Sequence, residues 1–107
     1  MKERNQSLPA GVSRTVRGLC EDYDRRALEI ERGRLPPEVL GHYMILNATI
    51  DAALATCCEE EIRNEIRYDI GARVGHRFTQ IYYLSQGTYR ARKLESTLAI
   101  AKAMKLI

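Results

Sequence analysis

The sequence predicts an all-α fold: a small helical bundle with a C-terminal helix-turn-helix. Apolar residues recur at intervals of three and four along most of the chain, which is the period of an amphipathic helix. No segment alternates apolar and polar residues over the length of a strand. With 107 residues the chain has room for one domain, so we expect these helices to share one core.

The first helix is predicted from Ser13, the expected N-cap, to about Gly33. Residues 1–12 lack periodicity and are expected to form a flexible N-terminal arm. The apolar stripe of the helix contains Val16, Leu19, Cys20, Tyr23, Ala27 and Ile30. The opposite face alternates in charge, which indicates a solvated surface with i,i+4 ion pairs, and carries Arg17, Glu21, Asp22, Arg25, Arg26 and Glu29.

A second helix is predicted after Pro36 and Pro37, because the first proline favours an extended residue before it and the second suits a first helical turn. Apolar side chains surround much of this helix: Val39, Leu40, Tyr43, Met44, Ile45, Leu46, Ile50, Ala53, Leu54 and Cys57. We expect it to be the central helix of the core or half of a dimer interface. Residues 13–58 would then form a helical pair for support or dimerisation.

The remaining residues, 59–107, are expected to form the helix-turn-helix segment of the same domain. A third helix begins near Glu59, where three successive carboxylates are favourably placed against the helix dipole, and ends near Gly75. Its buried row is Ile62, Ile66, Ile70 and Val74. A short helix capped by Thr79 follows, and Ser85 caps a last helix that runs to the C-terminus.

One segment of the C-terminal half carries positive charge without any acidic residue. The whole sequence has 17 Lys and Arg against 14 Asp and Glu, and a net charge of +3 is too mild to identify a partner. The segment from Arg73 to Lys93, however, contains no acidic residue and holds Arg73, Arg77, Arg90, Arg92 and Lys93. A basic helix that follows a short apolar helix and a turn is typical of major-groove binding.

Individual side chains of this segment suit contacts with DNA. On the last helix, we expect the inward side to contain Tyr89, Leu94, Thr97, Leu98 and Ala101. Glutamine pairs well with adenine and arginine with guanine, so the candidates for base contacts are Gln86, Thr88, Arg90, Arg92 and Lys93. The candidates for phosphate contacts are Arg73, His76, Arg77, Thr79 and Ser85.

Three strings in residues 59–107 carry a family resemblance: YDIGARVG at Tyr68–Gly75, IYYLSQGTYRARK, and IAKAMKLI at the C-terminus. Together they resemble the C-terminal part of phage transcriptional regulators of the RinA and ArpU type. More distantly, they are similar to region four of sigma factors, where Ser or Thr at the turn precedes Gly-Thr and a basic helix. After Lys93 the chain departs from the family pattern of further cations, with Leu94, Glu95 and Ser96.

The resemblance implies a DNA-binding regulator of phage late genes. At the family's turn and recognition helix it places Ser85, Thr88, Tyr89, Arg90 and Arg92. We therefore expect sequence-specific binding of duplex DNA by a homodimer, with RNA polymerase as a further candidate partner. One short recognition helix reads few base pairs, which favours a dimer.

Other classes of function lack the residues that they need. The cysteines Cys20, Cys57 and Cys58 show no C-x₂-C spacing, and His42 is far from His76 in the sequence, so no metal site is predicted. No nucleophile with a nearby base and no glycine-rich phosphate loop is apparent, so we predict neither an enzyme nor a cofactor. The cysteines are expected to be reduced thiols.

The expected location is the cytoplasm. The N-terminal residues are polar, unlike a signal peptide, and no apolar run approaches the roughly 18 residues of a membrane span, so no membrane partner is expected.

The rival hypothesis is a small helical phage assembly or protein-interaction module. A packaging protein similar to a terminase small subunit lies between the two hypotheses, because it binds DNA within a ring. A dimer favours the regulator, a large ring favours packaging, and failure to bind DNA favours the assembly module.

Overall fold

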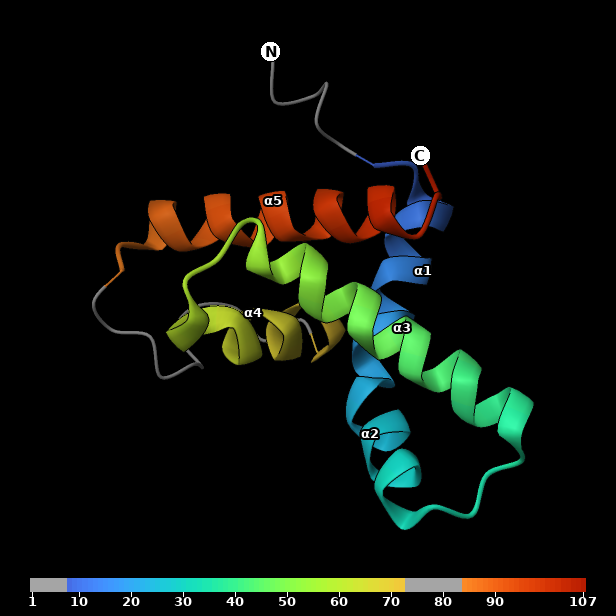
Figure 1. Ribbon diagram of the computed structural model, residues 1–107. Coiled ribbons are helices and arrows are strands. Elements are labelled where there is room, and N and C mark those ends of the chain that lie inside the picture. The colour runs from blue at the N-terminus through green and yellow to red at the C-terminus, as the bar shows by residue number, and fades with distance from the viewer. Residues whose placement is uncertain (1–7, 73–83) are drawn as a thin grey trace.

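The computed structural model describes residues 8–72 and 84–107, which form five α-helices without a strand among them (Figure 1). These are α1 (Ala10–Glu21), α2 (Tyr23–Arg32), α3 (Pro37–Ala55), α4 (Glu60–Ala72) and α5 (Gln86–Ala103). The prediction of an all-α fold is confirmed. The short helix expected after Thr79 and the helix end at Gly75 lie outside the described residues, so the helix-turn-helix stays a prediction.

The single helix predicted from Ser13 to Gly33 is in fact two helices. α1 begins at Ala10, directly after Pro9, so residues 10–12 are helical and the predicted cap at Ser13 is wrong. The chain leaves helical geometry at Asp22, with φ −92° and ψ 1°, and α2 ends as predicted at Gly33, which has φ 70°. The Asp22 carboxylate makes no cap hydrogen bond to the backbone here and instead accepts from Nε and Nη2 of Arg25 at 2.6 Å.

The bend at Asp22 gives Arg26 a role that the sequence did not indicate. Instead of lying on the solvated face, Arg26 is buried, with 2% of its surface exposed. Its Nε donates to Oδ1 of Asn47 at 2.7 Å, and its Nη2 donates to the carbonyl oxygen of Leu19 at 2.6 Å. The guanidinium therefore ties α1, α2 and α3 together.

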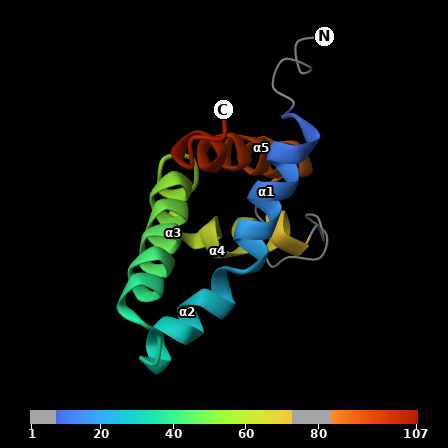
Figure 2. The same ribbon diagram turned by 90° about the vertical axis from the view of Figure 1, so that its right-hand side faces the viewer.

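The helices of the two halves of the chain share one core. α1 packs against α4, α3 packs against α5, and α2 packs against α3. Viewed from the side, α5 lies across one end of the molecule while α1 and α3 extend from it towards α2 at the other end (Figure 2). The apolar core side chains with at most 2% of their surface exposed are Val16, Ile50, Leu54, Ile62, Ile66, Tyr89, Ile100 and Ala101. The buried row predicted for the third helix is confirmed from Ile62 to Ile70.

A close approach of two backbones sets the position of α1 on α4. A Cβ atom added to Gly71 would lie 2.8 Å from both Cα and N of Glu21, and 3.1 Å from the carbonyl carbon of Cys20. Contacts below about 3 Å are not tolerated between a side chain and a rigid backbone. Glycine at this position thus lets α1 cross α4 closely.

The second predicted helix, α3, begins at Pro37 as expected and is only partly a core helix. Ile50 and Leu54 are buried, whereas Met44 and Ile45 have exposed fractions of 51% and 66%. Two large apolar side chains next to each other on the surface are unusual for a helix that serves only the core.

In residues 8–72 and 84–107, no helix is both long enough and apolar enough to cross a membrane.

Candidate nucleic-acid interface

The start of α5 is fixed by the side-chain cap that the sequence predicts. Ser85 is extended, with φ −66° and ψ 160°, and its Oγ accepts a hydrogen bond from the backbone N–H of Thr88 at 3.1 Å. The Ser85 hydroxyl in turn donates to Oγ1 of Thr88 at 3.0 Å. These bonds satisfy a free backbone N–H of the first turn and give the helix a defined beginning.

A buried carboxylate anchors the second turn of α5 on α4. Asp69 is fully buried and accepts from the hydroxyl of Tyr89 at 2.7 Å and from Nζ of Lys93 at 3.2 Å. Tyr89 is 1% exposed, so its predicted inward orientation is confirmed. Hydrogen bonds to a charged acceptor are stronger than neutral ones, which makes this contact a firm support for the helix.

Leu94 was expected to face inward, and that expectation is wrong. Its exposed fraction is 37%, whereas the buried line of α5 contains Tyr89, Ser96 and Ile100 at a spacing of seven and four. At about 100° per residue, Leu94 projects well away from that line. Ser96 was not recognised as buried from the sequence; its Oγ lies 3.0 Å from Sγ of Cys58.

The candidates for base contacts lie on two different flanks of α5. Gln86, Arg90 and Lys93 are spaced by four and three residues and therefore share one flank, whereas Thr88 and Arg92 share another. The predicted set does not form one continuous contact surface. A base-reading surface on the first flank would use Gln86 and Arg90, both of which are exposed.

On the other flank, Arg92 is engaged by the fold. Its Nε and Nη2 lie 3.4 and 3.3 Å from the carboxylate oxygens of Glu59, and its Nη1 lies 4.0 Å from Oε1 of Glu95. The hydrogen bond from Arg92 lowers the pKa of the Glu59 carboxyl, and the same bond raises the pKa of Arg92. Both side chains remain partly exposed, so this pair is a weak link between α5 and the start of α4.

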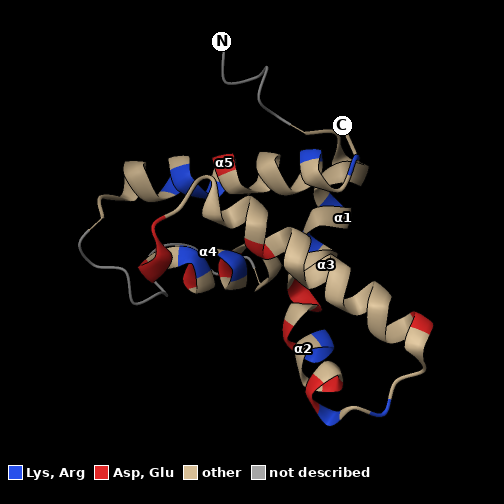
Figure 3. Ribbon diagram, in the orientation of Figure 1, with Lys and Arg blue, Asp and Glu red and all other residues tan. Residues whose placement is uncertain are grey.

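Arg90 differs from Arg92 because it has no ion-pair partner within residues 8–72 and 84–107. It is exposed, and so is Gln86 one turn before it. Figure 3 shows more blue than red along α5, whereas α2 carries both colours and the start of α4 is red. The cation at Arg90 is therefore available to a ligand.

The predicted phosphate contacts are largely untested by the structure. Arg73, His76, Arg77 and Thr79 lie outside the described residues. Ser85 is described, and its hydroxyl serves the helix cap. A contact between Ser85 and a phosphate stays a prediction.

The environments of Cys20 and Cys58 suppress the reactive thiolate form of their side chains. Cys20, Cys57 and Cys58 are free, and burial raises the pKa of Cys20 to about 12. Burial also raises the pKa of Cys58. A thiol with a raised pKa is a poor nucleophile and a poor metal ligand at neutral pH. In the described part of the chain, no three His, Cys, Asp or Glu side chains gather in a way that could hold a metal ion.

In comparisons with protein-family models, curated proteins and solved structures, the chain has no match.

Proposed function

We propose that the protein binds duplex DNA through the start of α5 and acts as a transcription regulator of the phage type. The observation that carries this proposal is the exposed pair of Gln86 and Arg90, which lie four residues apart on one flank of a capped helix. Side chains four apart on a helix project in the same direction, so both can reach neighbouring base pairs.

The surroundings of this pair suit a recognition helix. The cap at Ser85 and the bonds to Asp69 fix the first turns of α5 before any ligand binds, which lowers the entropic cost of binding. Gly87 is exposed, with open space around the position of an added Cβ atom. A glycine there permits close approach of a phosphate backbone to the helix.

We further propose that the DNA-binding form is a homodimer joined through α3. The exposed Met44 precedes Ile45, which lines a shallow groove together with Lys102 and the small side chains Ala48, Thr49, Ala52, Ala53, Thr56, Ala99 and Ala103. Large apolar side chains next to a groove of small ones can interdigitate with a second copy of the same surface. Two copies would present two α5 helices to DNA, and RNA polymerase remains a candidate partner of the assembly.

The first prediction compares two arginines of the same helix. In selection from a random duplex pool, the wild type should enrich a defined site. We expect Arg90→Gln to lose preference at a base position of that site, with a loss of about 1–3 kcal/mol for the preferred base. Arg92→Gln removes the same charge from the same helix, but it should enrich the wild-type site because Arg92 is paired with Glu59.

Sequencing of the enriched pools measures this difference directly. Unchanged preference in Arg90→Gln, or equal losses in both variants, would contradict the role given to Arg90. If the wild type retains no duplex even at low salt, the rival assembly module replaces the DNA-binding proposal. Sedimentation of the protein with its selected site then distinguishes a dimer, as proposed here, from the large ring of a packaging protein.

A further inference from the structure

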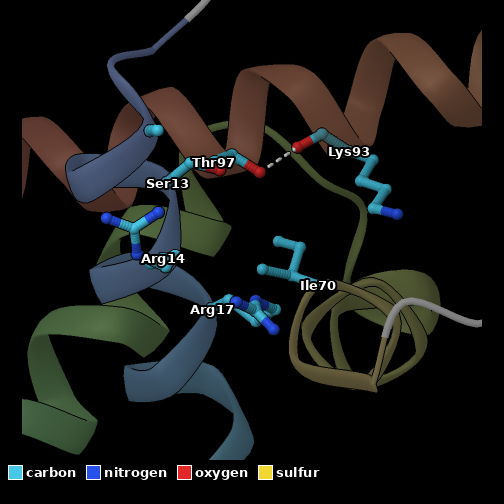
Figure 4. Close-up of a pocket in the computed structure, with 7 residues that line it drawn as sticks. Ser13, Arg14, Arg17, Ile70, Lys93 and Thr97 are labelled. Atoms are coloured by element: carbon cyan, nitrogen blue, oxygen red, sulfur yellow. Dashed lines mark hydrogen bonds between the residues drawn. The ribbon is translucent and has the colours of Figure 1, made fainter.

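A positively charged cleft lies between α1 and α5, next to the flank that carries Arg90. Its volume is about 440 Å³, and its lining residues are Ala10, Ser13, Arg14, Arg17, Ile70, Lys93 and Thr97. In Figure 4 Arg17 projects from α1 towards Ile70 of α4, Lys93 and Thr97 belong to α5, and the guanidinium of Arg14 lies over α1 itself. The cleft brings together cations that are distant in the sequence.

The fold leaves much of this charge without compensation. Among residues 8–72 and 84–107, neither Arg14 nor Arg17 has a hydrogen-bond or ion-pair partner, and no carboxylate of these residues lines the cleft. Lys93 is paired with Asp69, so two of the three cations lack a partner in the described part of the chain. Like charges held close together repel each other, and an anion bound between them would remove that cost.

The donors of the cleft fit a phosphate group. Guanidinium groups bind phosphate oxygens in a bidentate manner, and an ammonium group contributes a point charge. Ser13 is exposed and adds a hydroxyl, whereas the hydroxyl of Thr97 already donates to the backbone carbonyl of Lys93 at 2.9 Å. The apolar wall at Ile70 lowers the local dielectric and strengthens the attraction for an anion.

The position of the cleft indicates where that phosphate comes from. Gln86, Arg90, Lys93 and Thr97 follow one another at spacings of four, three and four, so they lie on one flank of α5. The first two are the proposed base contacts, and the last two line the cleft. A duplex seated on the start of α5 would therefore extend its backbone towards Arg14 and Arg17.

We infer that the cleft binds a backbone phosphate of the DNA that α5 contacts, which makes α1 part of the interface. This inference rests on the proposed function. Arg14 and Arg17 would contribute affinity without sequence preference, because every base pair offers the same phosphates. Bases would be read from α5 and the backbone held from α1.

The test measures the salt dependence of binding to the selected duplex. The variant Arg14→Gln plus Arg17→Gln should bind on the order of tenfold more weakly at 0.1 M salt, and its slope of log K against log salt should fall by about 0.9, the value for one phosphate. Its base preference should equal that of the wild type. Glutamine matches arginine in helix propensity, so circular dichroism and thermal unfolding should show an intact fold.

The matched control is Arg32→Gln plus Arg34→Gln, which removes the same charge at the end of α2 and the loop after it. If the wild type binds DNA and both double variants have the same affinity and slope, the inference fails while the proposed function stands. If the wild type binds no DNA, both fail together. The inference gains support only if the cleft variant alone loses slope.

A parallel titration with inorganic phosphate distinguishes a small-anion site from a backbone contact. We expect weak binding of inorganic phosphate to the wild type, reduced in Arg14→Gln plus Arg17→Gln, alongside the loss of DNA affinity in that variant. Loss of phosphate binding with unchanged DNA affinity would overturn the backbone assignment and identify a site for free anions.

Discussion

Two sets of arginines in this small protein have opposite relations to the fold. Arg26 and Arg67 are 2% and 8% exposed, and both donate hydrogen bonds to described side chains. The guanidinium carbon of Arg67 also lies 3.9 Å from the ring centroid of a tyrosine on α2. Arg14, Arg17 and Arg90 have no such partner in the described part of the chain. The fold uses the first set for its own contacts and leaves the second set without a partner in residues 8–72 and 84–107.

This difference shows why net charge says little about the binding surface. The sequence presents all of these arginines as cations on helices, with similar neighbours. Only the packing of distant elements decides which of them acquire acceptors. A charge that the fold has already satisfied contributes little to DNA binding, because a phosphate would have to replace an existing partner.

Of the substitutions that distinguish the two sets of arginines, we expect the largest change in stability at Arg26. Arg26→Met should lower the free energy of unfolding by about 2–4 kcal/mol, because two acceptors, on Asn47 and Leu19, lose their buried donor. Arg25→Met is the control, since Arg25 is exposed and its pair with Asp22 is at the surface. Urea unfolding of both variants measures the difference. Equal stabilities would mean that the buried guanidinium is not structural.

A smaller loss of stability is expected at Gly71, where α1, the helix that carries Arg14 and Arg17, crosses α4. Gly71→Ala should lower the free energy of unfolding by about 1–3 kcal/mol, because its methyl group meets the backbone of Glu21 at 2.8 Å. By displacing α1 from α4, it should also reduce the salt slope of DNA binding. Gly87→Ala, with open space around it, should be neutral or stabilising. If thermal unfolding shows that Gly71→Ala is as stable as the wild type, the close crossing of α1 and α4 is contradicted.

Local rules were sufficient for much of the fold. The cap at Ser85, the helix end at Gly33 and the start at Pro37 follow from the conformational preferences of those residues alone. The break at Asp22 was missed because the apolar period continues through it. Leu94 was misplaced because the periodic pattern of α5 fits more than one choice of buried face.

The candidate site was less accessible to sequence reasoning. Pairing of Arg92 with Glu59 and of Lys93 with Asp69 depends on acids in α4 or just before it, far away in the chain. The cleft depends on the crossing of α1 and α4 at Gly71, which no local pattern reveals. Residue type alone identified the candidates for binding. Only tertiary packing distinguished the cations that pair with carboxylates of the fold from those that have no such partner in the described residues.

The most direct test of this separation is an NMR titration of isotope-labelled protein with the selected duplex, observing the arginine Nε–H signals. We predict that the signals of Arg14, Arg17 and Arg90 shift on binding while those of Arg26 and Arg67 stay unchanged. If the duplex leaves the first three signals in place, or shifts only the buried pair, the division between structural and DNA-binding arginines is wrong.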